Sequence, residues 1–171
     1  MDKFDIIVVG SGPGGYVAAV RAAQLGKSVA VIERSEIGGI CLNWGCIPTK
    51  ALLKSAQAYT YALHAAEYGF EASEVKADIT KIVQRSRGVA AQMSKGVEFL
   101  LKKNKITLIH GEAVLRSGHT VEVTSSEDGS KTMYEADHII LAVGSRANSL
   151  PFAPIDGERI ISYRQALVPE K

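Results

Sequence analysis

The chain has 171 residues, of which 46% are hydrophobic, and its formal net charge at pH 7 is +2. This length suits one domain or slightly more, and the hydrophobic content is enough to bury a core. The near-neutral charge argues against a nucleic-acid-binding surface, and no apolar run approaches the roughly 20 residues that a membrane span requires.

The chain begins with the pattern of a dinucleotide-binding unit. Residues 4–9 form a short apolar run, which is typical of a strand buried on both faces. This strand leads directly into the Gly-x-Gly-x-x-Gly fingerprint Gly10-Ser11-Gly12-Pro13-Gly14-Gly15. In such a fingerprint Gly10 makes the tight turn, Gly12 admits a pyrophosphate and Gly15 lets the next helix pack on the strand.

A helix, a second strand and an acidic residue complete the unit. An alanine-rich helix is expected over 14–25, and residues 28–32 predict another buried strand that ends at Glu33. Glu33 stands eighteen residues after Gly15, where a carboxylate hydrogen-bonds the ribose of a bound adenosine. The unit by itself does not distinguish NAD from FAD.

Both cysteines of the chain, Cys41 and Cys46, follow shortly after this strand. In a regular α-helix, residues five apart have Cα atoms about 8–9 Å apart, whereas a disulfide tolerates about 7 Å. A bonded pair therefore needs a distorted turn, which we expect over 41–47, ahead of a regular helix over 48–65. The spacing alone leaves open a redox-active pair and two inert buried thiols. No metal site is expected, because the histidines show no ligand spacing.

The rest of the chain predicts a long helix and a β-meander. Asp78 is a candidate N-cap for a helix that continues to about Leu101. The basic residues of this helix are expected on a solvated face: Lys81, Arg85, Arg87, Lys95, Lys102 and Lys103. Strands are expected over 106–110, 111–115, 119–124, 131–134 and 138–143, and a short helix over 163–167.

The dithiol segment resembles the redox-active disulfide of the flavoprotein disulfide reductases, class I of the pyridine nucleotide-disulfide oxidoreductases. The resemblance rests on the run Gly38-Gly39-Ile40-Cys41-Leu42-Asn43-Trp44-Gly45-Cys46-Ile47-Pro48-Thr49-Lys50 and extends over nearly the whole chain. Leu42 and the ending 47–50 look most like the dihydrolipoamide dehydrogenase branch, with the glutathione and mercuric reductases as alternatives. Family members are far longer, so a truncated first segment is expected.

The resemblance implies an α/β fold, a Rossmann-like FAD-binding domain with a parallel sheet, flanking helices and a β-meander. Residues 1–150 would be the first segment of this domain, and 151–171 a linker toward a missing NAD-binding domain. FAD is favoured over NAD because the dithiol segment begins five residues after Glu33. An extended FAD could then place its adenosine at Glu33 and its isoalloxazine beside Cys46.

The resemblance also implies a role for each site residue. Cys41 would be the interchange thiol that exchanges with the substrate, and Cys46 the thiol that faces the flavin. Lys50 would hold the reactive edge of the flavin and favour a nearby thiolate. Cys41 and Lys50 also count among the expected FAD contacts. The other expected FAD contacts are Gly10, Gly12, Pro13, Gly14, Gly15, Glu33, Arg34, Gly39, Glu112, Ala113, Ala142, Gly144 and Ser145.

The implied activity is the oxidation of protein-bound dihydrolipoamide, with FAD as the cofactor and NAD as the final acceptor. The expected partner is the lipoyl-bearing acyltransferase of a 2-oxoacid dehydrogenase complex. The resemblance implies that the full-length parent is a homodimer. A cytoplasmic location is expected, because no signal or transit peptide precedes the first strand. The family's catalytic histidine and glutamate lie downstream of Lys171, so the chain is expected to be inactive alone. An alternative of another class is a non-catalytic FAD-binding or interaction module.

Overall fold

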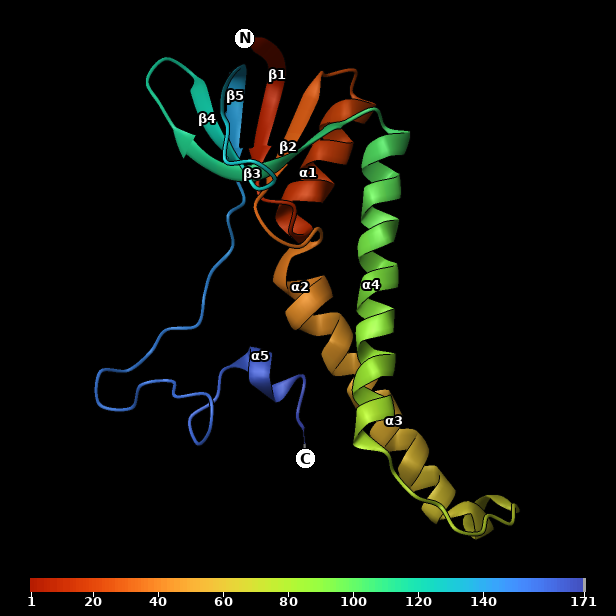
Figure 1. The fold of residues 1–171 in the computed structure, drawn as a ribbon. Helices are drawn as coiled ribbons and strands as arrows, with labels where there is room; N and C mark the ends of the chain where they lie inside the picture. Colours follow the sequence, from red (N-terminus) through yellow and green to blue (C-terminus); the bar gives the residue numbers. More distant parts are fainter. Residues whose placement is uncertain (171) are drawn as a thin grey trace. The chain divides into compact units, whose positions relative to one another are not determined.

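The computed structural model describes residues 1–170, which divide into two compact units (Figure 1). The first unit contains Met1–Leu42 and Gln92–Ser145, and the second contains Asn43–Ala91 and Arg146–Lys171. All the strands of the described residues belong to the first unit. None of the helices within residues 1–170 has both the length and the apolar character that crossing a bilayer requires.

A five-stranded sheet that closes into a barrel forms the first unit (Figure 1). Strand β1 (Asp2–Val9) pairs in parallel with β2 (Val29–Glu33) and with β5 (Lys131–Leu141). Strand β3 (Thr107–Leu115) is parallel to β2, and β4 (Thr120–Ser125) is antiparallel to both β3 and β5. The predicted α/β fold with a parallel sheet and a β-meander is confirmed.

Strands β3 and β5 each take part in both the parallel sheet and the meander. Strand β3 pairs with β2 as far as His110 and with β4 from Gly111 onward. Strand β5 pairs with β4 over its first half and with β1 over its second half. The prediction of two separate strands in each stretch was wrong, because the backbone exchanges one partner strand for the next without interruption.

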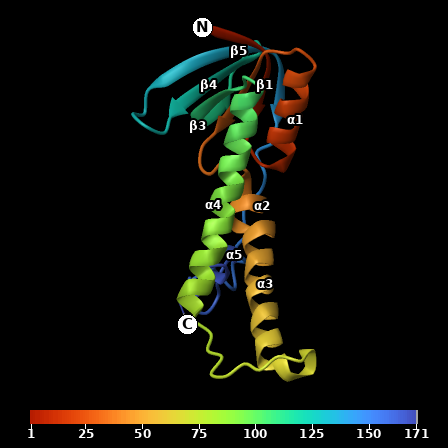
Figure 2. The same ribbon diagram turned by 90° about the vertical axis from the view of Figure 1, so that its right-hand side faces the viewer.

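The interior of the barrel is apolar, as the strand patterns predict. All five residues of β2 are buried, which is typical of a strand in the middle of a parallel sheet. Helix α1 (Pro13–Gln24) packs on β1 and β2 with small buried residues, Gly15, Ala19 and Ala22 (Figure 2). The buried core cluster consists of Ile7, Ala30, Ile32, Val121, Val123 and Ala136.

A reciprocal polar contact joins β1 to the residue that precedes β2. The backbone N–H of Asp5 donates to the hydroxyl of Ser28 at 2.8 Å. The Asp5 carboxylate in turn accepts from the Ser28 hydroxyl at 2.6 Å and from the Ser28 N–H at 2.7 Å. These donors, above all the Ser28 hydroxyl, stabilise the charged form and lower the pKa of Asp5 to about 2.

The second unit contains helices, two of which continue into the first unit at residues 39–42 and 92–103. Helix α2 (Gly39–Trp44) is followed after Gly45 by α3 (Cys46–Leu63) and by the 3₁₀ turn η1 (Ala65–Tyr68). Helix α4 (Ile79–Lys103) begins after Asp78, whose carboxylate accepts from the N–H of Lys81 at 3.1 Å, so the predicted N-cap is confirmed. The start of α4 lies alongside α3 in both views (Figures 1 and 2). A short helix, α5 (Tyr163–Ala166), lies near the position predicted for it.

The distorted turn expected over residues 41–47 is confined to Gly45. The backbone there has φ −147° and ψ −112°, whereas the residues on both sides are helical. Helix α3 starts two residues before Pro48, which lies in the first helical turn, where a missing N–H removes no intrahelical bond. This helix was expected to flank the sheet, but it belongs to the second unit.

Candidate functional site

The carboxyl ends of the parallel strands meet at one edge of the sheet. Val9 pairs with both Ile32 and Leu141, and Glu33 pairs with His110, so β1, β2, β5 and the parallel part of β3 end in register. Parallel α/β sheets bind their ligands outside this edge. Four of the predicted FAD contacts follow these positions within two residues: Gly10, Arg34, Glu112 and Ala142.

The glycine fingerprint packs closely against two other predicted FAD contacts. Gly10 has a φ of 101°, and a Cβ there would lie 2.3 Å from the carbonyl oxygen of Ala142. A Cβ on Gly39 would lie 2.8 Å from the Cα of Gly12. The structure therefore brings together residues 10, 12, 39 and 142, which come from three separate parts of the sequence.

The first turn of α1 is open to a ligand. Its N-cap residue, Gly12, has no side chain to bond the helix N–H groups, and the first turn contains no acidic residue. Pro13 and Gly14 are exposed, and a Cβ on Gly14 would meet no atom within 4 Å. The helix dipole and the N–H groups at such a terminus attract an anion. These residues therefore fit the diphosphate of a dinucleotide.

Glu33 lies at the end of β2, and the residue is only 9% exposed. Its Oε2 accepts from the N–H of Ser11 at 2.9 Å and from the Ser11 hydroxyl at 2.6 Å, and its Oε1 accepts from the N–H of Ser35 at 2.9 Å. Each carboxylate oxygen has two acceptor sites, so Oε1 retains capacity for a ribose hydroxyl. Glu33 thus fits the adenosine half of the nucleotide.

Ser11 is a site residue that the sequence prediction missed. Its side chain is fully buried, and its hydroxyl accepts from the N–H of Gly38 at 3.2 Å while it donates to Glu33. This one hydroxyl joins the fingerprint, the acidic residue and the segment that leads to the first cysteine. A hydroxyl residue at the second position of the fingerprint, with an acid at the next strand end, was the available signal.

The remaining predicted FAD contacts are more exposed. Arg34 and Glu112 form an ion pair at 3.7 Å, and both side chains are exposed. Ala113 is half-buried and pairs with Val123 of β4. Gly144 and Ser145 lie on the exposed segment after β5, where Gly144 has a φ of 68°. The structure therefore brings Arg34 and Glu112 together, and it places Gly144 and Ser145 on an exposed segment after the end of β5.

The two cysteines lie on either side of the break at Gly45. Cys41 is half-buried on α2 and belongs to the first unit, whereas Cys46 is exposed as the first residue of α3 in the second unit. Lys50 is exposed and follows Cys46 by one turn on the same helix, so both lie on one face. The break supplies the departure from regular helix that a bonded pair requires, and the disulfide itself stays a prediction.

Two arginines of α4 that were expected on a solvated face instead contact the helices that carry the cysteines. Arg85 donates to the carbonyl of Ala51 at 2.8 Å, and Arg87 donates to the carbonyl of Asn43. The guanidinium of Arg87 also lies 4.2 Å from the ring centroid of Trp44. Arg85 is nevertheless exposed, as predicted, whereas Arg87 is half-buried. The prediction was wrong for Arg87, because helical periodicity does not reveal which polar side chains face a neighbouring helix.

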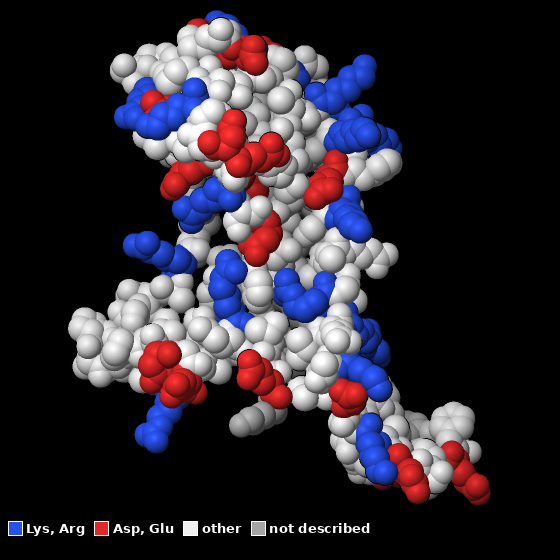
Figure 3. Space-filling model, in the orientation of Figure 1, with Lys and Arg blue, Asp and Glu red and all other residues white. Residues whose placement is uncertain are grey.

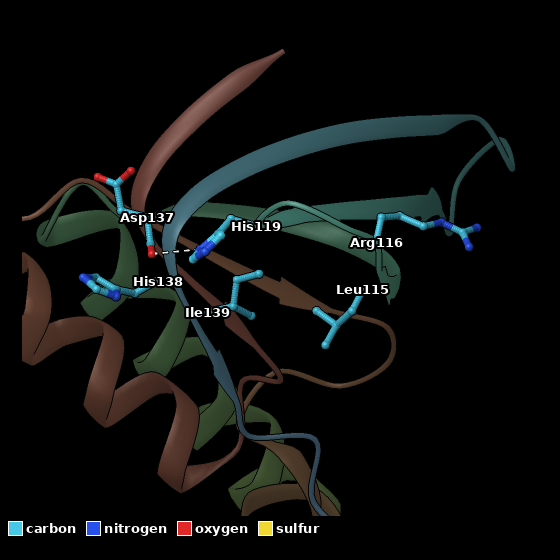
Figure 4. A pocket seen from close by; sticks show the side chains of 6 residues that line it. All are labelled: Leu115, Arg116, His119, Asp137, His138 and Ile139. Atoms are coloured by element: carbon cyan, nitrogen blue, oxygen red, sulfur yellow. Dashed lines mark hydrogen bonds between the residues drawn. The ribbon is translucent and has the colours of Figure 1, made fainter.

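A cavity of about 380 Å³ on the barrel does not gather functional groups (Figure 4). Figure 4 shows Arg116 and His138 pointing in opposite directions, and Arg116 forms an ion pair with Glu122 at 3.1 Å. Within residues 1–170 no group of three or more Cys, His, Asp and Glu side chains could hold a metal ion. On the face drawn in Figure 3, basic and acidic side chains are interspersed.

Comparison with known proteins places these features in context. A family model described as pyridine nucleotide-disulphide oxidoreductase matches residues 4–168. The chain is 49% identical over 166 residues to a dihydrolipoyl dehydrogenase of Chlorobaculum parvum, and the matched region covers 97% of this chain and 35% of that protein. It is also 49% identical over 168 residues to a dihydrolipoyl dehydrogenase of Zymomonas mobilis, where the matched region covers 98% of this chain and 36% of that protein.

A solved structure shows the same fold. The crystal structure of LpdA from Mycobacterium tuberculosis is 29% identical and matches with a TM-score of 0.87 over 100% of this chain and 38% of its own. The chain therefore spans little more than a third of the length of the relatives that it matches.

Proposed function

Because the chain belongs to the pyridine nucleotide-disulphide oxidoreductase family, we propose that it is the FAD-binding and dithiol-bearing portion of a dihydrolipoyl dehydrogenase. Relatives that are 49% identical to it carry that name. The observation that carries the proposal is the strand register, which gathers Gly10, Glu33 and Ala142 at one edge of the sheet.

In this proposal residues 1–150 form the first segment of the FAD-binding domain, and 151–171 form a linker toward a NAD-binding domain. The first unit ends at Ser145, five residues before this boundary, and residues 43–91 of the proposed domain belong to the second unit. The segment from Ser145 to α5 contains no strand and only an isolated bridge between Leu150 and Ala153, as a linker would.

The residues at the sheet edge fit FAD in a defined order. Glu33 would hold the adenosine ribose, with Arg34, Glu112 and Ala113 beside the adenine. The fingerprint residues and Gly39 would hold the diphosphate, and residues 142–145 with Cys41 and Lys50 would contact the flavin half. When bound, FAD accepts the two electrons that the dithiol releases and passes them to a nicotinamide nucleotide.

The chain's own contribution is thiol–disulfide exchange. A substrate thiolate attacks the sulfur of Cys41, the bond between Cys41 and Cys46 breaks, and Cys46 leaves as a thiolate. The second substrate thiol then attacks the substrate sulfur of the mixed disulfide and releases Cys41. Two electrons have then passed from the dihydrolipoyl group to the cysteine pair. One of the two substrate thiol protons is on Cys41, and the other is released to solvent while Cys46 remains a thiolate. Lys50, one turn after Cys46, would stabilise the Cys46 thiolate.

We infer that a polypeptide of only these 171 residues does not turn over lipoamide and binds FAD weakly or not at all. It carries one dinucleotide fingerprint, whereas NAD as final acceptor needs a second nucleotide site. A positioned acid–base group, typically worth about 10²–10⁴-fold, would come from the rest of the enzyme. The lipoyl-bearing acyltransferase partner, the homodimer and the cytoplasmic location likewise belong to the complete enzyme.

A chimera tests the proposed function. This chain replaces the corresponding 35% of the Chlorobaculum parvum protein, and NAD reduction by dihydrolipoamide is measured. We expect turnover with bound FAD, and a thiolate–flavin charge-transfer band on reduction. Cys46→Ser should abolish both turnover and the band, whereas Cys41→Ser should abolish turnover and keep the band.

Other outcomes identify the alternatives. A chimera that binds FAD but turns over no disulfide substrate would support a non-catalytic module. Faster reduction of glutathione disulfide than of lipoamide would support the glutathione reductase alternative. Full activity in both cysteine variants would contradict the proposed chemistry, with Ser55→Ala as a control on the same helix.

A further inference from the structure

The helices that carry the cysteines are interrupted at a single residue. Helix α2 ends at Trp44, α3 begins at Cys46, and Gly45 between them has φ −147° and ψ −112°. Helical values lie near −63° and −42°. Carbonyl groups in the last turn of a helix have no N–H partner within that helix, so the carbonyl of Asn43 at the end of α2 takes a donor from elsewhere.

Three consecutive residues of α4 supply donors on both sides of this break. These residues are Arg85, Ser86 and Arg87. Their acceptors are, in the same order, the backbone carbonyls of Ala51, Pro48 and Asn43. Ser86 is fully buried and Arg87 is half-buried, so the bonds nearest the break are shielded from water. Hydrogen bonds from a guanidinium are charge-assisted and stronger than neutral ones.

Trp44, the one tryptophan of the chain, has two guanidinium groups close to its ring. Its ring centroid is 4.2 Å from the Cζ of Arg87 and 4.6 Å from the Cζ of Arg164. Such cation–π contacts hold an aromatic ring in a fixed orientation. The ring stands three residues after Cys41 and two before Cys46, so its surroundings report on the dithiol segment.

We propose that Arg87 is a positioning residue for the dithiol. Arg87 holds the break at Gly45 and so shifts the equilibrium between the dithiol and disulfide forms of Cys41 and Cys46. The proposal rests on the proposed function, in which Cys41 and Cys46 exchange with a substrate disulfide. Residues five apart in a regular helix lie about 8–9 Å apart at Cα, too far for a disulfide. Contacts that favour the interrupted helix therefore favour the disulfide, and the disulfide favours those contacts by linkage.

The test is the equilibrium of the 171-residue chain with reduced and oxidised glutathione. One glutathione disulfide oxidises two protein thiols to one disulfide and is reduced to two glutathione molecules, and mass spectrometry after acid quenching and alkylation measures the ratio. We expect Arg87→Gln to lower the equilibrium constant for disulfide formation about tenfold, which corresponds to about 30 mV for a two-electron couple. Trp44 emission should shift to longer wavelength as the ring gains water.

Arg85→Gln is the matched control. It removes the same kind of side chain two residues earlier on α4, but Arg85 bonds Ala51 and leaves the Arg87–Trp44 contact in place. We expect this variant to keep both the equilibrium constant and the emission of the unsubstituted chain. An equal loss in both variants would overturn the proposal, since it would indicate a general effect of charge or of helix pairing.

An unchanged equilibrium constant in Arg87→Gln would also overturn the proposal. Far-UV circular dichroism checks folding, and if Arg87→Gln does not fold, Arg87→Lys is measured in its place. Lysine keeps the charge but lacks the planar guanidinium, which can stack on Trp44 and donate to Asn43 at the same time. We therefore expect Arg87→Lys to lower the equilibrium constant less than is expected for Arg87→Gln, and an unchanged constant would overturn the proposal. An unsubstituted chain that forms no disulfide at all would instead contradict the proposed function, so the two failures are distinguishable.

Discussion

Two neighbouring glycines of the fingerprint should respond to the same substitution with opposite signs. A Cβ on Gly15 would lie 1.8 Å from the carbonyl oxygen of Gly10, whereas one on Gly14 would meet no atom within 4 Å. We therefore expect Gly15→Ala to destabilise the chain and Gly14→Ala to leave its stability unchanged or to raise it.

The magnitude follows from the space available at each position. Side-chain Cβ atoms essentially never approach within 3.0 Å, so the contact at Gly15 must open by at least 1.2 Å, from 1.8 to 3.0 Å. The Gly10 carbonyl cannot move away freely, because the rest of Gly10 is held in place. The N–H of Gly10 donates to the carbonyl of Ile32 at 2.8 Å, and the Cα of Gly10 packs on Ala142. Overpacking of this kind costs about 1–3 kcal/mol. Alanine in place of an unconstrained helical glycine stabilises by about 0.4–1 kcal/mol.

Urea denaturation followed by circular dichroism at 222 nm measures both variants against the unsubstituted chain. The free energies of unfolding of Gly14→Ala and Gly15→Ala should differ by about 1.5–4 kcal/mol, with Gly15→Ala the less stable. Equal midpoints for the two variants, or a lower midpoint for Gly14→Ala, would refute the close packing of Gly15 on Gly10.

Further predictions concern the polar contacts of the first unit. Ser11→Ala should lower the free energy of unfolding by about 2–4 kcal/mol, because Glu33 loses a charge-assisted bond and the buried N–H of Gly38 loses its acceptor. Urea denaturation measures this loss, with Ser126→Ala on an exposed turn as the control. Equal effects of the two substitutions would contradict the role of the Ser11 hydroxyl. The pKa of Asp5 is depressed to about 2 in the folded chain, so its stabilisation is complete above its ordinary value of 3.8 and is lost as pH falls toward 2. The free energy of unfolding of Asp5→Asn should therefore fall less between pH 5 and pH 2.5 than that of the unsubstituted chain. Parallel curves of unfolding free energy against pH would rule out a contribution from the Asp5 carboxylate.

The sequence predicted those parts of the fold that local patterns specify. The strand over 4–9, the fingerprint, the first helix and the Asp78 cap each depend on residues close together in the chain, and each is present in the structure. The sequence predicted two strands, over 106–110 and 111–115, with Gly111 at the start of the second. Instead Gly111 lies where β3 exchanges partners, and a Cβ there would be 2.4 Å from the carbonyl oxygen of Thr124.

The missed features all depend on contacts between distant residues. The bond between Ser11 and Glu33 joins positions that become neighbours only when β1 and β2 pair. The role of Arg87 depends on which face of α4 meets the helices beside Gly45, and periodicity alone assigned that face to solvent. The distorted turn was predicted too long, because spacing shows that a break is needed but not how few residues can make it.

The most direct test of the account is thiol–disulfide exchange between the oxidised chain and dihydrolipoamide. The chain is oxidised with glutathione disulfide, treated with dihydrolipoamide, quenched in acid, alkylated and weighed by mass spectrometry. We predict that the oxidised chain takes up no alkyl group and that the treated chain takes up two, on Cys41 and Cys46, the only two cysteines present. Two alkylated cysteines before treatment, or a disulfide that dihydrolipoamide leaves intact, would contradict the account.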